Sequence, residues 1–224
     1  MSNYVLLGSA RSSFGHSEKG DQSGKEVSTQ GFYLPDCGYW LGFKLKNNLL
    51  GVNLGKAMLE ACENNNIGYS QPYRMTAREA YCRYGSIKGI KELCTCDCSS
   101  LVNLCLLSIG VNLPNFNTAS EPQVLRKSGL FDEVKVKSEK DCTTGMILVT
   151  PTKGHTLIVI TALTTEKPNN SVTNVTNLKS NEEIAKEVIQ GKWGNGNARK
   201  CKLEKAGYNY EEIRKLVNKM MGKK

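Results

Sequence analysis

Apolar residues recur at helical spacing in two stretches of the chain. From Val52 they fall three or four residues apart, until the polar run at residues 63–66 ends the pattern. From Cys98 to Gly110 a second apolar stripe follows Asp97, which stands at or beside an N-cap position. We therefore predict one helix that starts at Val52 and another over residues 98–110.

A third helix and two strands follow from shorter patterns. In "TAREAYCRYG", Thr76 can cap a helix, Glu79 lies three residues further on as in a capping box, and Gly85 suits the helix end. The runs at residues 145–150 and 155–161 are apolar and rich in β-branched residues, with only "PTKG" between them. They predict a hairpin, or two neighbouring strands, inside the core.

Composition divides the chain into two modules of an α+β protein. Residues 1–164 hold the predicted helices and strands of one module, whose first fifty residues we expect to form loops and short strands. Residues 165–180 are mostly Thr, Asn, Ser, Lys and Val, which indicates a linker. Residues 181–224 contain three short amphipathic segments that end at glycine, and they predict three helices.

Bulk composition excludes several classes of protein. The apolar content of 39% is ordinary for a globular chain, and no run of about 18 apolar residues occurs, so we expect no membrane insertion. The first residues lack the basic head and apolar core of a secretory signal, which favours folding in a cytosol. There cysteines stay reduced, and the odd count of nine argues against a complete disulfide framework.

The net charge of +9 indicates a polyanionic partner without naming it. Nucleic acid and an anionic cell wall both fit this charge. Residues 181–224 alone carry 11 Lys and Arg against 6 Asp and Glu. No nucleic-acid-binding motif occurs in the chain, so we expect no nucleic-acid partner.

The stretch "CTCDC" allows a metal site, buried small side chains or one reactive cysteine. Structural zinc usually takes four ligands from paired Cys-x-x-Cys or Cys/His sets, and this spacing differs. We therefore expect no metal. Cysteine also packs as a small hydrophobe. Three cysteines of the helical patterns are assigned to that class: Cys62, Cys82 and Cys105.

Cys98 has a different setting, because it falls in the first turn of a predicted helix. The helix dipole and the unpaired amides there stabilise a thiolate, and the same amides can face a developing oxyanion. A thiolate nucleophile needs a base, which is normally a histidine. His155 begins an apolar strand, where its side chain can point into a cleft while its neighbours fill the core. We predict Cys98 as the nucleophile and His155 as the base.

The motifs "DCSSLV" and "GHTLIVI" resemble the nucleophile and base motifs of the NlpC-type cell-wall cysteine peptidases and their CHAP relatives. The longer pattern from "GDQSGKEV" through "NIGYSQPYR" and "CTCDCSSLVNLC" to "TKGHTLIVI" resembles a phage endolysin group and spans residues 20–160. The resemblance implies a papain-like α+β fold for the first module. It also implies a Cys98–His155 catalytic pair with no metal or organic cofactor.

Further site residues follow from the same resemblance. Tyr69 matches the tyrosine that helps line the substrate cleft, and we place Asp97 and Gln22 beside it as substrate-binding residues. A turn between two glycines is the alternative for the loop that holds Gln22. The family's third polar residue, which orients the histidine, has no match in residues 161–170.

The C-terminal segment resembles the CW-type cell-wall-binding repeat first recognised in a pneumococcal phage lysozyme. The match includes "GKWGNG", "AGY" and the closing "VN". It implies a three-helix bundle that binds peptidoglycan fragments, with Lys192 and Arg199 on the binding surface and Trp193 in the core. A single repeat implies weak wall binding unless the enzyme forms a homo-oligomer.

Together these patterns predict a phage endolysin that hydrolyses an amide bond of Gram-positive peptidoglycan. We favour a stem-peptide endopeptidase. The alternatives are an N-acetylmuramoyl-L-alanine amidase with the same machinery and a non-catalytic wall-binding protein. The expected location is the host cytoplasm, from which a holin would release the enzyme to the wall.

Overall fold

The computed structural model divides the chain into two compact units, residues 1–164 and 165–224. Helices and strands are mixed, which confirms the α+β class. The described residues are 4–11, 26–152, 154–163, 181–195, 199–200, 203, 208 and 210–222. None of the helices within these ranges is long and apolar enough to cross a membrane.

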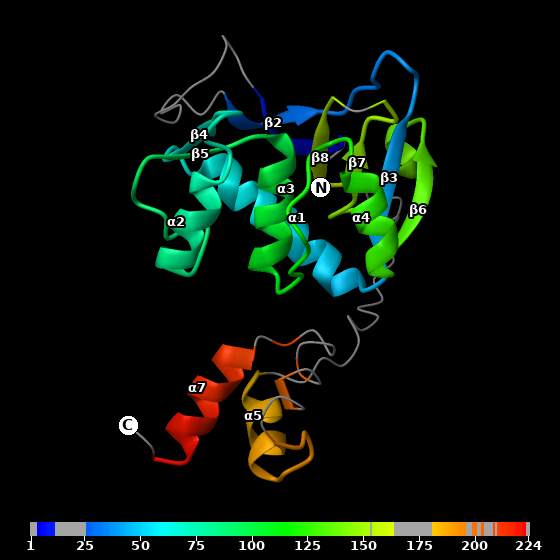
Figure 1. Ribbon diagram of the computed structural model, residues 1–224. Coiled ribbons are helices and arrows are strands. Elements are labelled where there is room, and N and C mark those ends of the chain that lie inside the picture. Colours follow the sequence, from blue (N-terminus) through cyan, green and yellow to red (C-terminus); the bar gives the residue numbers. More distant parts are fainter. Residues whose placement is uncertain are drawn as a thin grey trace. The chain divides into compact units, whose positions relative to one another are not determined.

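A six-stranded antiparallel sheet forms the centre of the first unit (Figure 1). Its strand order is β2-β1-β8-β7-β3-β6. The first strand of the chain therefore pairs with the last one described in this unit. The strands are β1 (Leu6–Ala10), β2 (Val27–Gly31), β3 (Trp40–Leu45), β6 (Phe131–Val136), β7 (Ile147–Val149) and β8 (Thr156–Thr161).

Strand β8 is buried on both faces. Ile158 and Ile160 belong to the main core cluster, while Leu157 and Val159 belong to a second cluster that also contains Trp40. Successive residues of a strand point to opposite faces, so β8 supports both clusters. The predicted pairing of the two apolar runs is confirmed, because β7 and β8 are antiparallel neighbours.

Two helices, α1 (Asn48–Glu63) and α3 (Cys98–Ser108), pack against β8 and each other. Their buried side chains fill the main core cluster, and Cys105 is fully buried there as predicted. Helix α1 starts earlier than its apolar stripe suggested. The side chain of Asn47 accepts hydrogen bonds from the Leu49 and Leu50 amides at 3.0 and 3.2 Å and begins the helix there.

A separate parallel pair joins β4 (Ile67–Tyr69) to β5 (Cys94–Cys96). In its register Tyr69 lies opposite Cys96, two residues before Cys98. The Ser70 amide extends the pairing by donating to the Cys96 carbonyl at 3.0 Å. This pair therefore carries Tyr69 to the start of α3.

Helix α2 (Thr76–Tyr84) corrects two local predictions. Met75 is its N-cap, and the Thr76 hydroxyl accepts from the Thr95 amide at 2.8 Å, so Thr76 ties the helix to β5 instead of capping it. Cys82 is exposed and not buried, because the short helix turns Ala77 and Ala80 inward. Its predicted end is confirmed, since the C-cap Gly85 has φ 76°.

Two more short elements complete the described first unit. Helix α4 (Glu121–Ser128) packs against β6, and the 3-10 turn η1 (Glu139–Asp141) follows that strand. The apolar spacing did not predict α4. It has only one fully buried leucine, Leu125, and it starts with a buried glutamate.

The second unit contains α5 (Asn181–Ile189) and α7 (Tyr210–Met220), which pack together. Their core joins Ile184, Ala185, Val188, Leu203, Ile213 and Val217. Trp193 packs against this cluster, as predicted, and its ring meets Tyr208 edge to face at 5.9 Å. Most of the segment between residues 195 and 210, where the middle helix is predicted, lies outside the described residues.

Candidate functional site

Cys98 is the first residue of α3, as the sequence predicted. Asp97 caps the helix, because its Oδ1 accepts from the Ser100 amide at 2.6 Å and from the Ser99 hydroxyl at 3.0 Å. The Ser100 hydroxyl completes the box by accepting from the Asp97 amide at 2.8 Å. This reciprocal box holds the turn before α3 and places the thiol at the positive end of the helix.

His155 directly precedes β8, and hydrogen bonds hold its backbone on both sides. Its amide donates to the Thr150 hydroxyl at 3.1 Å, and its carbonyl accepts from the Thr150 amide at 3.0 Å. Gly154 has a φ of 150°, which side chains rarely adopt, and its amide donates to the Thr118 hydroxyl at 3.2 Å. The chain therefore enters β8 along a defined path that carries the imidazole.

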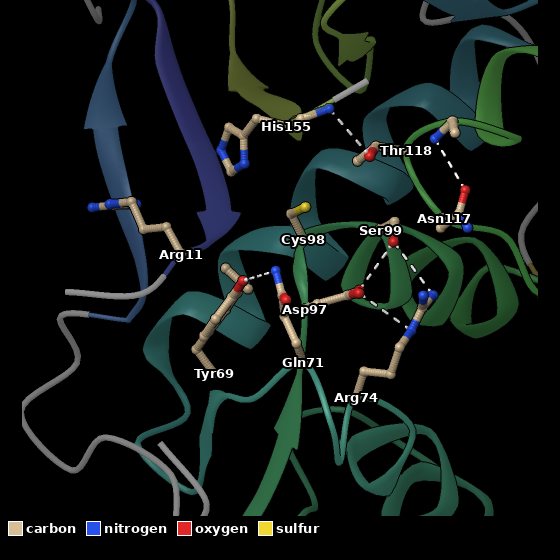
Figure 2. A pocket seen from close by; sticks show the side chains of 13 residues that line it. Arg11, Tyr69, Gln71, Arg74, Asp97, Cys98, Ser99, Asn117, Thr118 and His155 are labelled. Carbon is tan, nitrogen blue, oxygen red and sulfur yellow. Dashed lines mark hydrogen bonds and ion pairs between the residues drawn. The ribbon is translucent and has the colours of Figure 1, made fainter. Parts of the chain in front are cut away.

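Cys98 and His155 line the same pocket, whose volume is about 630 Å³ (Figure 2). The Thr156 backbone amide lies near the Cys98 thiol and acts to lower the pKa of that thiol. The thiol therefore lies against the residue that follows His155. The remaining lining residues are Ala10, Arg11, Tyr69, Gln71, Arg74, Asp97, Ser99, Asn117, Thr118, Ala119 and Gly154.

Burial controls the charge state of the pair. It raises the pKa of the Cys98 thiol to about 12, and the Asp97 carboxylate adds to this effect. The amides of Thr156 and Ser99 act in the opposite direction but do not outweigh burial. Burial also lowers the pKa of His155 to about 4, with a further contribution from Arg11. At neutral pH the pair is therefore an uncharged thiol beside an uncharged imidazole.

Asp97 also forms an ion pair at the pocket wall. Its Oδ2 lies 3.2 Å from Nε of Arg74, and the two side chains are only 12% and 21% exposed. The N–H of that nitrogen does not point at the oxygen well enough for a hydrogen bond. Arg74 also donates to the Ser99 hydroxyl at 3.3 Å and to the Phe116 carbonyl. Asp97 therefore has structural partners on both oxygens.

Tyr69 lies in the pocket with its ring almost fully buried. Its hydroxyl accepts a hydrogen bond from Gln71 at 3.0 Å, and its amide donates to the Glu26 carboxylate at 2.9 Å. Burial raises the pKa of the Tyr69 phenol, so the hydroxyl stays protonated and can donate. Gln22, the other predicted substrate-binding residue of this unit, lies outside the described residues.

Arg11 and Arg74 are pocket residues that the sequence reasoning missed. Figure 2 shows the Arg11 guanidinium turned away from Cys98, and it donates to the Ser28 hydroxyl of β2 at 2.7 Å. Its stem lines the pocket while its charge acts on His155. Arg74 lies five residues after Tyr69 in "YSQPYR". A cationic residue so close in sequence to a predicted cleft residue could have indicated that Arg74 also lines the cleft.

The two cysteines before Cys98 are buried in β5. The Cys94 thiol points to the Asn66 carbonyl and the Cys96 thiol to the Gly68 carbonyl, at 3.6 Å each. Burial raises the pKa of Cys94 to about 12 and that of Cys96 well above its usual value. Within the part of the chain that the structure describes, no group of three or more His, Cys, Asp or Glu could hold a metal ion.

The predicted wall-binding residues of the second unit differ in their surroundings. Lys192 is exposed. Arg199 is half-buried, and its guanidinium donates to the Gly194 carbonyl at 2.8 Å and to the Asn195 side chain at 2.7 Å. Arg199 therefore holds Gly194 and Asn195 in place, and much of its hydrogen-bonding capacity is used within the unit.

Family models match both units of the chain. Residues 11–166 match the endolysin-like domain, and residues 182–221 match the CW_7 repeat. The chain is also similar to a protein named lysozyme from Streptococcus phage Cp-7. The two are 43% identical over 61 residues, which cover 27% of this chain and 18% of that protein. The chain therefore spans less than a fifth of that relative's length. No solved structure matches the chain significantly.

Proposed function

This chain belongs to the endolysin-like domain family, and we propose that its first unit hydrolyses an amide bond of bacterial peptidoglycan. The observation that carries the proposal is the convergence of Cys98, at the first turn of α3, and His155, at the start of β8, in one pocket. A cysteine at the start of a helix and a histidine at the start of a strand also support the papain-like relationship inferred from the motifs. The relatives' names agree with a wall-degrading role.

In the proposed first step, the Cys98 sulfur attacks the carbonyl carbon of the scissile amide while the thiol proton passes to the imidazole of His155. The neutral state of both groups favours proton transfer during the attack over attack by a preformed thiolate. A free thiolate is scarce when the thiol pKa is about 12. The backbone amides of the first turn of α3 stabilise the oxyanion. The imidazolium then protonates the leaving amine, and a thioester remains on Cys98.

In the second step, water hydrolyses the thioester. His155 takes a proton from the water and returns it to the sulfur, which restores the thiol and releases the acid product. Tyr69, Asp97 and Gln22 are proposed to bind the substrate. The structure sharpens this proposal for Tyr69, whose protonated hydroxyl lies in the pocket. No step requires a metal or an organic cofactor.

The second unit is proposed to bind the Gram-positive wall and to raise the local concentration of the first unit on it. The CW_7 match and the basic charge of residues 181–224 support this role. Lys192 is the better candidate for a wall contact, because Arg199 already holds Gly194 and Asn195 in place. Release from the host cytoplasm by a holin, and a homo-oligomer that would strengthen wall binding, remain parts of the same proposal.

Digestion of purified Gram-positive sacculi, followed by mass spectrometry of the soluble products, tests the proposed function. A stem-peptide endopeptidase releases muropeptides with shortened stems, and this is the expected result. Products with intact stems separated from muramic acid would identify an amidase. Release of neither class by the wild type, with Cys98→Ala as the matched control, would leave only the non-catalytic wall-binding alternative and refute hydrolysis.

A further inference from the structure

Glu121 is a fully buried acid that the proposed reaction does not use. It is 0% exposed and forms the first residue of α4. Its Oε1 accepts from the Thr156 hydroxyl at 2.9 Å. Its Oε2 is buried without a hydrogen-bond partner among the described residues. Burial raises the pKa of this carboxyl well above its ordinary value.

The partner of Glu121 is part of the candidate site. Thr156 is itself 0% exposed, it follows His155, and its amide acts to lower the pKa of the Cys98 thiol. Two side chains from the 118–121 segment therefore hold the chain on either side of His155. Thr118 accepts from the Gly154 amide at 3.2 Å, and Glu121 accepts from the Thr156 hydroxyl.

We propose that Glu121 is a positioning residue for the Cys98–His155 pair. Through Thr156 it anchors the first residue of β8 to α4, so that the imidazole and the Thr156 amide both face the thiol. This role rests on the proposed function for its catalytic consequence. The family's third polar residue, which orients the histidine, has no match along the strand after His155. Within the described residues, Glu121 is a candidate to orient His155 instead.

The alternative explanation is that Glu121 serves only the stability of the core. An apolar side chain of similar length would serve that purpose without burying an unpartnered oxygen. The choice of a carboxyl at this position is therefore better explained by the hydrogen bond to Thr156. Removal of the bond should change the reactivity of the pair more than it changes folding.

The test compares Glu121→Met, which removes the acceptor, with Glu121→Gln, which keeps an acceptor oxygen at the same place. Thr156→Val removes the donor and keeps the β-branched shape. Leu125→Val is the control, because it loosens the core beneath the same helix without touching the bond. For each full-length variant, kcat and KM are measured on soluble muropeptides, and Cys98 alkylation by iodoacetamide is measured against pH.

We expect Glu121→Met and Thr156→Val to lower kcat by about tenfold with KM nearly unchanged, because the pair is misplaced while the rest of the cleft is intact. The double variant should be no worse than either single one. In Thr156→Val, which keeps Glu121, alkylation at pH 8 should slow by about threefold, since the Thr156 amide moves away from the thiol. Glu121→Gln should recover most of the loss in kcat, and Leu125→Val should lower only the Tm.

Two results would overturn the proposal. One is an unchanged kcat in Glu121→Met, and the other is an equal loss of kcat in Glu121→Met and Glu121→Gln. If Glu121→Met does not fold, Thr156→Val decides in the same way. If the wild type cleaves no muropeptide, the proposed function fails, and the alkylation profiles alone then decide whether Glu121 positions the pair.

Discussion

The buried imidazole of His155 should make folding sensitive to mild acid. Its pKa of about 4 in the folded protein lies below the ordinary 6.5, so the unfolded chain binds a proton that the folded chain does not. The free energy of unfolding therefore falls as the pH drops from 6.5 toward 4 and is fully retained above 6.5. The perturbation that isolates this effect is His155→Asn, which removes the titration.

The size of the effect follows from the two pKa values. A difference between 6.5 and about 4 costs the folded state about 2 kcal/mol by pH 5 and about 3 kcal/mol by pH 4, relative to pH 7. The ring keeps partial exposure, and solvent screening brings the pH 5 figure to between about 1 and 2 kcal/mol. Other groups, Glu121 among them, titrate in both proteins and cancel in the comparison.

Urea unfolding of the wild type and His155→Asn at pH 7 and pH 5, followed by tryptophan fluorescence and circular dichroism, measures the difference. We expect the wild type to lose between about 1 and 2 kcal/mol more than the variant over this interval. Parallel losses in the two proteins would refute the buried neutral imidazole. They would indicate instead that folding does not shift the pKa of His155, whereas a smaller loss in the wild type would indicate an imidazolium beside a thiolate.

Three further outcomes are expected. Cys98→Ala should abolish wall lysis, while Cys96→Ser should keep most of it, because the Cys96 thiol points to a backbone carbonyl. Equal losses of lysis in a turbidity assay would contradict the assignment of Cys98 as the single nucleophile. Asp97→Ala should lower the free energy of unfolding by about 2 kcal/mol in urea titrations, since the cap of α3 and the partner of Arg74 are both lost. An unchanged urea midpoint would count against this structural role of Asp97. Truncation after residue 164 should preserve cleavage of soluble muropeptides but reduce lysis of intact walls. Equal wall lysis by the truncated and full-length proteins, at both low and moderate salt, would show that the second unit is dispensable.

The nucleophile end of the site was predictable because its determinants are local. The apolar stripe after Cys98 and the polar pattern of Asp97 and Ser100 are contained within one turn and one helix. The pairing of β7 with β8 was predictable for the same reason, since only a short loop separates two apolar runs.

The rest of the site depends on contacts between distant parts of the chain. Arg11 directly follows β1 and comes to the pocket because β1 pairs with β8. Strand β1 itself is short and contains a glycine and a serine. Arg74 reaches Asp97 across 23 residues, and Glu121 reaches Thr156 across 35. Helical or strand periodicity does not encode such pairings. For the same reason, local capping preferences misassigned Thr76, whose hydroxyl bonds across to β5.

If Cys98 attacks the substrate carbonyl, an acyl group is transiently bound to its sulfur, and this covalent intermediate can be trapped. Wild-type protein is mixed with soluble muropeptides, quenched in acid within the first turnover, and digested for peptide mass spectrometry. We expect an acyl group on the peptide that contains Cys98, absent from the Cys98→Ala control and lost on mild treatment with hydroxylamine. Cleavage of muropeptides by Cys98→Ala at the wild-type rate, with no adduct on any cysteine, would contradict attack by Cys98.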